Sequence, residues 1–313
     1  GAAAHHTHKH KPSGFRSSPP RRPIGMVVVE DEMCEKLRKA NGIENVFEWL
    51  GTGGFSSVFR CQCSGIHDQV AVKVLKYKDA LPGRGKEAEF LQGLQHPHLV
   101  NVLGHVDDPQ CILLELCSGG SLQAALYTSD VWENVPASDR LRAGCDIASG
   151  LNYLHAEGIL HRDLKPGNVF LHTPIIVGEA LPMVKLGDLG LARPCCEFDI
   201  MTQGVGTLRY MAPEVLESGQ YSLSADIYSF GVMLHELLTG NEPFCGKSEA
   251  RVVLMVAAGE RPPFNDLYME MSDLGEDSVQ KLWLLMEACW DGDSDSRRDA
   301  GSVLETLHEV YES

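Results

Sequence analysis

Eight consecutive residues, His161-Arg-Asp-Leu-Lys-Pro-Gly-Asn168, hold an acid, a base and an amide that together could serve phosphoryl transfer. A carboxylate at Asp163 can accept a hydroxyl proton, and the ammonium of Lys165 can neutralise a transferring phosphoryl group. The amide of Asn168 offers a neutral oxygen ligand for Mg²⁺. Taken in isolation, a polar surface loop in which Asp163 and Asn168 cap turns would explain the same residues. The assignment therefore depends on what accompanies this loop elsewhere in the chain.

A glycine-rich stretch, Gly51-Thr-Gly-Gly-Phe-Ser-Ser-Val58, has β-rich sequence on both sides. A dinucleotide-binding fold needs a helix directly after its glycines, so the strand-like residues 57–63 argue against an oxidoreductase. Together the two stretches resemble the glycine loop and the catalytic loop of eukaryotic protein kinases. The resemblance makes Asp163 the base, Lys165 the charge stabiliser and Asn168 a metal ligand. It also implies that the glycine loop contacts ATP through Gly51, Thr52, Gly53, Gly54, Phe55, Ser56 and Val58, with Ser56 where a third glycine is usual.

The strand-like run Val70-Ala-Val-Lys-Val-Leu75 places Lys73 among apolar residues, where an ammonium without a partner would be costly. A strand-edge lysine with its charge in water is the alternative. The resemblance supplies a partner, because Glu87 occupies the place of the glutamate in the kinase αC helix. Glu89 points about 200° around the same helix and is the weaker candidate. Lys73 would then hold the α- and β-phosphates, with Glu87 orienting it.

Two further segments complete the resemblance at the nucleotide site. Residues 115–120 run from a strand into Ser-Gly-Gly and resemble the kinase hinge, whose backbone binds adenine and whose gatekeeper would be Leu114. Asp188-Leu-Gly190 corresponds to the metal-binding Asp-Phe-Gly of kinases, so Asp188 would be the second Mg²⁺ ligand, with Mn²⁺ as an alternative ion. The implied contacts to the nucleotide from the rest of the site are Ala71, Lys73, Leu114, Glu115, Cys117 and Phe170.

The second half of the chain carries the landmarks of a helical kinase lobe. Glu214, in Met-Ala-Pro-Glu, resembles the buried partner of an arginine near the C-terminus, and Arg297 is the best match by its spacing after Cys289-Trp290. Asp226, in a capped apolar helix, would bond to the backbone of the catalytic loop. Arg-Pro-Pro-Phe264 and Cys289-Trp290 resemble the tyrosine-kinase-like group of Ser/Thr kinases.

The fold implied by the resemblance is α+β, a two-lobed protein kinase. Its N-lobe would be a five-stranded antiparallel sheet with helix αC, and its C-lobe would be mainly helical. We expect a disordered basic tail at residues 1–25, a leader helix at 26–45 and a kinase domain at 46–312. Within that domain the N-lobe would span 46–116, the hinge 117–120 and the C-lobe 121–312.

The composition limits the classes of partner. The chain has 313 residues and a net charge of −16, and its first 25 residues hold five bases and no acid, so the remainder is strongly acidic. An acidic body argues against binding of nucleic acid. No apolar run approaches the ~20 residues of a membrane span, and the ten scattered cysteines fit reduced thiols. These features favour a cytoplasmic setting and protein substrates, and they leave the oligomeric state open.

The expected activity is transfer of the γ-phosphoryl group of Mg-ATP to Ser or Thr hydroxyls of proteins. Lys165 and Gly206-Thr207 resemble Ser/Thr kinases, with Thr207 in the substrate platform. Dual specificity remains open. The rival from another class is a pseudokinase, a folded scaffold that regulates a partner without catalysis.

Control is expected through the segment between Asp188 and Glu214. Arg162 adjoins Asp163 in a loop that already holds Lys165, so a nearby anion would compensate its charge. A phosphate on Thr202 would supply one within reach of Arg162 and Arg193. The alternative is a permanent anion at Glu197 or Asp199.

Overall fold

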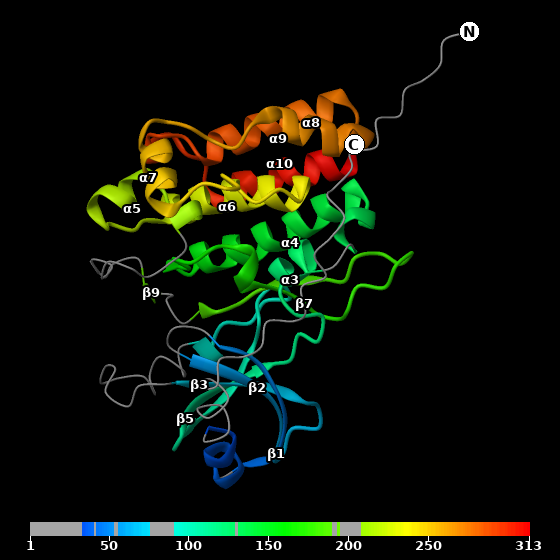
Figure 1. Ribbon diagram of the computed structural model, residues 1–313, viewed down its shortest axis with the longest axis vertical. Coiled ribbons are helices and arrows are strands. Elements are labelled where there is room, and N and C mark those ends of the chain that lie inside the picture. The colour runs from blue at the N-terminus through cyan, green and yellow to red at the C-terminus, as the bar shows by residue number, and fades with distance from the viewer. Residues whose placement is uncertain are drawn as a thin grey trace.

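The computed structural model describes residues 33–40, 42–52, 56–75, 91–128, 131–189, 193–194 and 208–313. Figure 1 shows a smaller lobe built on a β-sheet at the bottom and a larger lobe made mainly of helices above it. The chain crosses from one lobe to the other between strand β5 (Gln110–Glu115) and helix α3 (Leu122–Tyr127). The two-lobed α+β fold predicted from the sequence is confirmed.

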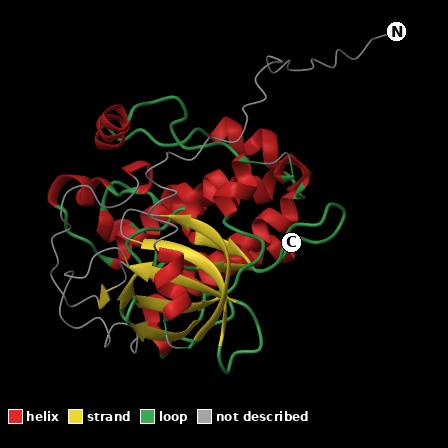
Figure 2. Cartoon of the chain, turned by 60° about the horizontal axis from the view of Figure 1, so that its bottom comes forward, coloured by secondary structure: helices red, strands yellow, loops and turns green. Residues whose placement is uncertain are grey.

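The smaller lobe is a five-stranded antiparallel sheet in the order β1-β2-β3-β5-β4. Figure 2 brings this lobe forward and shows its strands in yellow. Side chains alternate between the two faces of a strand, so Val70, Val72 and Val74 of β3 share one buried face of the sheet. Lys73 points to the opposite face. The helix expected to carry Glu87 lies outside the described residues. Besides β5, the strands are β1 Ile43–Thr52, β2 Ser56–Cys63, β3 Val70–Leu75 and β4 Val102–Asp107.

A short helix over residues 33–39 packs on this sheet, with Leu37 and Ala40 in the same core as Phe59. Gly42 ends the helical stretch in the left-handed region, at φ 90°, which glycine adopts without strain. Strand β1 then begins at Ile43, so residues 43–45 are strand rather than part of the leader helix expected at 26–45. The physical reason is that Ile43 is buried in this core and pairs with Cys63 of β2.

The larger lobe is centred on α6 (Leu223–Thr239), which is buried along nearly its whole length. A mainly apolar helix that is buried on all sides belongs in the middle of a domain. Helices α4 (Ala137–Ala156) and α9 (Glu276–Cys289) pack against it, and α10 (Ala300–Glu312) packs against α4. The remaining helices are α5 Pro213–Ser218, α7 Glu249–Ala257 and α8 Phe264–Met271, with 3-10 turns at Trp132–Asn134, Pro166–Asn168, Leu208–Tyr210, Ser272–Leu274 and Ser294–Ser296.

Two short strand pairs lie between the lobes. Strand β7 (Val169–Leu171) pairs with β8 (Val184–Leu186), and β6 (Ile159–Leu160) pairs with β9 (Arg193–Pro194). The segment before β4 also pairs with strand β8, since Leu99 forms a parallel bridge with Leu186. These pairs hold the catalytic loop and the segment around Asp188 beside each other.

Candidate active site

The catalytic loop is fixed to the core by Asp226 of α6, whose carboxylate is completely buried. Its Oδ2 accepts the backbone N–H of His161 at 2.7 Å, and its Oδ1 accepts that of Arg162 at 2.9 Å. Arg162 adopts a left-handed backbone conformation, with φ 71°. This conformation costs free energy and persists only where surrounding contacts hold it. The Asp226 bonds supply such contacts, as does Tyr221, whose hydroxyl donates to the Arg162 carbonyl at 2.8 Å. The expected bond from Asp226 to the loop backbone is confirmed.

The acid, base and amide of the loop contact one another directly. Lys165 Nζ lies 2.7 Å from Asp163 Oδ2. Asn168 Nδ2 donates to the backbone carbonyl oxygen of Asp163 at 2.7 Å and to the side-chain Oδ2 of Asp163 at 2.8 Å. The Asp163 carboxylate is therefore held by a charged donor and a neutral donor.

Lys73 of β3 forms a hydrogen-bonded ion pair with Asp188, across 115 positions of sequence. Burial by itself would raise the pKa of Asp188, but the charge and hydrogen bond of Lys73, together with more distant charges, outweigh burial and hold that pKa below its usual range. Charge from His161 and Lys165 acts in the same direction. Asp188 therefore carries its negative charge at neutral pH. The expected pairing of Lys73 with Glu87 lies outside the described residues and stays a prediction.

The two predicted metal ligands are brought together through Gly187. Its N–H donates to the Asn168 carbonyl at 2.8 Å, and its own carbonyl lies 3.0 Å from His161 Nε2. Since Asn168 uses its amide nitrogen to hold Asp163, its amide oxygen is the atom left to act as a ligand. A carboxylate and an amide oxygen are the donor set that suits a hard divalent cation. The residues present therefore fit a site for a hard divalent cation.

Most of the predicted nucleotide-binding residues that the structure describes lie on adjoining strands of the five-stranded sheet, whereas Cys117 follows β5 and Phe170 lies in β7. Across β2 and β3, Val58 pairs with Lys73, and across β3 and β5, Ala71 pairs with Leu114. At the start of the glycine loop, Thr52 Oγ1 lies 2.7 Å from Ser57 Oγ, which links the strands on either side of the loop. Phe170 of β7 packs against Gly187, where an added Cβ would meet its ring at 3.0 Å. Gly53, Gly54 and Phe55 lie outside the described residues.

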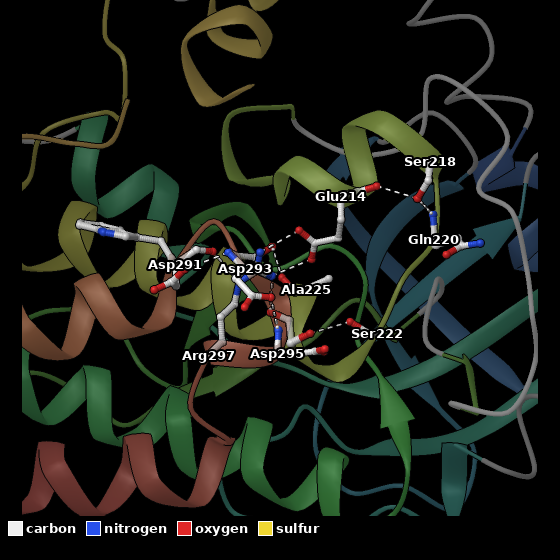
Figure 3. A network of polar contacts seen from close by, with 12 residues as sticks. Glu214, Ser218, Gln220, Ser222, Ala225, Asp291, Asp293, Asp295 and Arg297 are labelled. Carbon is white, nitrogen blue, oxygen red and sulfur yellow. Dashed lines mark hydrogen bonds and ion pairs between the residues drawn. The ribbon is translucent and has the colours of Figure 1, made fainter. Parts of the chain in front are cut away.

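A bidentate ion pair joins Glu214 to Arg297, as the sequence spacing predicted (Figure 3). Arg297 Nη1 and Nη2 donate to the two carboxylate oxygens at 2.6 and 2.7 Å. The guanidinium is fully buried, also donates to the Ser224 carbonyl, and lies over the Tyr228 ring at 5.1 Å. The pair fixes the start of α5 to the segment before α10.

The regulatory and acceptor-site predictions fall largely outside the described part of the chain. Thr202, Thr207, Glu197 and Asp199 are not described, and Arg193 is described only in its backbone, which pairs with Leu160. The structure does place Arg162, which is buried within the catalytic loop.

The sequence analysis missed a buried carboxylate, Glu236 of α6. Tyr210, just before Met-Ala-Pro-Glu, donates its hydroxyl to Glu236 Oε2 at 2.7 Å, and Tyr127 of α3 donates to Oε1. Burial raises the pKa of Glu236 to about 7, although both tyrosine hydrogen bonds oppose the shift, and Glu242 and Arg209 act on it with opposite signs. In the sequence, the only sign of this buried carboxylate was a glutamate within the mainly apolar pattern of α6.

Glu236→Gln is expected to flatten the pH dependence of stability between about pH 4.5 and 7. The folded protein binds a proton at Glu236 more readily than the unfolded chain does over this window. The wild type therefore loses stability as pH rises through it, whereas glutamine stays neutral. Urea unfolding at about pH 5 and about pH 8 measures the change. The exposed Glu217 of α5 provides the control Glu217→Gln, and equal slopes for wild type and Glu236→Gln would contradict the prediction.

In the described residues, we find no helix that is both long and apolar enough to span a bilayer.

Comparison with known proteins identifies the family to which this site belongs. The sequence model of the protein kinase domain matches residues 45–308. The serine/threonine-protein kinase STY46 of Arabidopsis thaliana is 30% identical over 269 residues, which cover 83% of this chain and 43% of that protein. Mitogen-activated protein kinase kinase kinase 10 of Homo sapiens is 32% identical over 278 residues, covering 85% of this chain and 28% of that protein.

The chain thus spans less than half the length of these two curated relatives. The family match nevertheless covers both lobes and every element described around Asp163, Lys73 and Asp188. The order of the glycine loop, Lys73, the catalytic loop and Asp188, together with this match, leads to one conclusion: the chain belongs to the protein kinase family.

Proposed function

We propose that this kinase domain transfers the γ-phosphoryl group of Mg-ATP to serine and threonine hydroxyls of protein substrates. The observation that carries the proposal is the contact of Asp163 with both Lys165 and Asn168, linked through Gly187 to the Lys73–Asp188 pair. These groups supply a proton acceptor, two cations for phosphate charge and two oxygen ligands within one connected network. Phosphoryl transfer depends mainly on such positioning and electrostatics.

Each residue has a defined task in this proposal. Asp163 accepts the proton of the acceptor hydroxyl, and Lys165, already in contact with Asp163, neutralises charge on the phosphoryl group in transit. Lys73 holds the α- and β-phosphates, oriented by Glu87. Asn168 and Asp188 would hold Mg²⁺, or Mn²⁺ in its place, and the bound ion would neutralise and align the phosphate oxygens.

The proposed domain runs from residue 46 to 312, with its hinge at 117–120, preceded by a leader segment and a basic tail. The family match over residues 45–308 supports these limits, although strand β1 already begins at Ile43. A cytoplasmic setting is proposed from the scattered cysteines of the sequence.

The experiment that tests the proposal combines activity and acceptor choice. Purified protein is incubated with Mg-ATP labelled at the γ-position and with a peptide array that presents Ser, Thr or Tyr as the single acceptor. We expect label on Ser and Thr peptides. Label mainly on Tyr would overturn the acceptor assignment, and no label on any peptide or on the protein itself would favour a pseudokinase.

We further propose that phosphate on Thr202 orders the segment between Asp188 and Glu214 by pairing with Arg162 and Arg193. Two added charges and three acceptor oxygens make such pairing favourable. Thr202→Ala is expected to lower the transfer rate much more than it changes the thermal midpoint of unfolding. Mass spectrometry should find the phosphate on active wild-type protein. Full activity of Thr202→Ala without phosphate at this position would instead support a permanent anion at Glu197 or Asp199.

A further inference from the structure

The connection between β7 and β8, residues 172–183, is fixed to the rest of the protein at both of its ends. At its start, the His172 carbonyl accepts the backbone N–H of Ser118, in the predicted hinge, at 3.1 Å. At its end, the backbone N–H of the buried Leu181 donates to Asp139 Oδ2 at 2.9 Å. Figure 1 shows the connection, in green, projecting from the side of the molecule beside β7. The tip of this connection is therefore held in a defined place.

The tip exposes two adjacent apolar side chains. Ile176 is 55% exposed and Val177 is 70% exposed. They precede Gly178, which adopts φ 89° in a turn closed by a hydrogen bond from the Glu179 N–H to the Ile176 carbonyl at 3.0 Å. Turns favour Gly, Pro, Asn, Asp and Ser, so two β-branched apolar residues at this place do not serve the turn itself. An anchored tip that exposes them side by side is a candidate contact surface.

These two side chains form one wall of a groove on the larger lobe. The opposite wall comes from the segment before α4 and includes Val131 and Pro136. Glu179 lines the groove beside the turn and is exposed, and the exposed Glu133 directly precedes the lining residue Asn134. The structure describes all of the lining residues, and none of them is basic. The groove therefore fits a segment that carries both apolar and basic side chains.

One stretch of the chain itself has this composition. Residues 9–16, Lys-His-Lys-Pro-Ser-Gly-Phe-Arg, hold three bases and the aromatic Phe15, with no acid. They lie outside the described residues. The chain between Phe15 and Met33, where the described part begins, can extend to about 60 Å at ~3.3 Å per residue. A domain of this size is about 50 Å across, so the groove is within reach.

Charge and tethering both favour this occupant. The first 25 residues hold five bases and no acid, whereas the remainder of the chain is strongly acidic, so the two parts attract each other. Because the segment is joined to the domain, its effective concentration at the groove is on the order of 1 mM. A contact with a Kd of about 0.1 mM would then be occupied about nine-tenths of the time.

We propose that this groove binds residues 9–16 of the same chain. Phe15 packs against the tip formed by Ile176 and Val177, and the basic side chains of the segment lie beside Glu179. Salt weakens the contact, because part of it is an attraction between exposed charges. The inference does not depend on phosphoryl transfer, since the groove lies outside the catalytic loop and binding needs no nucleotide.

The test is limited trypsin digestion of the 313-residue chain, with mass spectrometry measuring the initial rate of cleavage after Arg16. A bound segment is cleaved only when it leaves the groove, so this rate follows the unbound fraction. A synthetic peptide of residues 9–20 gives the rate for a segment that is never bound. We expect the wild type to be cleaved about tenfold more slowly than the peptide. The difference should shrink at about 0.5 M NaCl.

Substitutions in the groove should release the segment. Val177→Asp is expected to raise the cleavage rate about tenfold, to that of the peptide. Met269→Asp, on α8, is the matched control, because Met269 is 75% exposed and also apolar, and it should leave the rate within about twofold. Glu179→Lys tests the charge and should raise the rate about fivefold without removing an apolar contact. Circular dichroism establishes that each variant is folded.

A substitution in the segment tests whether the two sites act on each other. Lys11→Glu lies away from the cleaved bond and should raise the rate in the wild type. It should have no further effect in Val177→Asp, because both changes act through one contact.

The proposal fails if wild type, Val177→Asp and Met269→Asp are cleaved at equal rates. Independent effects of Lys11→Glu and Val177→Asp would place the segment elsewhere on the protein. Protection that grows with protein concentration would assign the groove to the segment of a second copy, and would overturn binding within one chain.

Discussion

Asp163→Ala is expected to lower kcat for phosphoryl transfer about 10³-fold, because it removes the proton acceptor. The affinity for Mg-ATP should stay within about threefold of wild type, since the predicted contacts to nucleotide come from other residues. Calorimetric titration with Mg-ATP and a steady-state assay on the best peptide of the array measure the two quantities separately. In Asp163→Ala, Lys165 and Asn168 also lose their shared partner, so part of the loss could come from their displacement.

Asp163→Asn addresses this displacement, because an amide keeps the size of the side chain and one acceptor oxygen for these donors. We expect its kcat to be nearly as low as that of the alanine variant, since an amide is not a base. Asp139→Asn serves as the matched control. Like Asp163, Asp139 of α4 is a partly buried aspartate. It accepts the backbone N–H of Leu181 at 2.9 Å and lies outside the catalytic loop. A kcat for Asp163→Asn comparable to that of Asp139→Asn would show that Asp163 does not act as the base.

Arg297→Ala is expected to lower the free energy of unfolding by about 3 kcal/mol, because it leaves the Glu214 carboxylate without its partner in a mostly buried site. The guanidinium is fully buried, whereas Glu214 is 28% exposed, so the loss should fall at the lower end of the range for buried pairs. The variant also loses the bond to the Ser224 carbonyl and the contact of the guanidinium with the Tyr228 ring. Urea unfolding followed by circular dichroism gives the change from the shift in midpoint.

The adjacent Arg298 provides a matched control. It is exposed, and its Nη1 donates to Thr306 at 2.8 Å on the surface of α10. Arg298→Ala should change the free energy of unfolding by no more than about 0.5 kcal/mol. Equal unfolding midpoints for the two alanine variants would mean that the Glu214–Arg297 pair contributes nothing to stability.

The sequence by itself determined the strands that form the sheet of the smaller lobe, the family and the identity of the catalytic loop. Each of these depends on residues close together in the chain. Alternation in Val70–Leu75 marks a strand because neighbouring side chains point to opposite faces, and the spacing from His161 to Asn168 is local enough to be recognised as a unit. The pairing of Glu214 with Arg297, 83 positions apart, was predicted because two short landmarks fixed both ends.

Other features became visible only in the tertiary structure. Lys73 contacts Asp188, and Glu115 contacts Lys185. Glu236 accepts hydrogen bonds from two tyrosines, one of them 109 positions away in the chain. In the sequence, Lys185 is one base in a short apolar strand and Glu236 is one acid in an apolar helix. Whether such a charge is exposed, paired or neutralised depends on which distant backbone lies opposite it. That arrangement is set by the packing of whole strands and helices, because burial makes an unpaired charge costly only after the surrounding elements have excluded water.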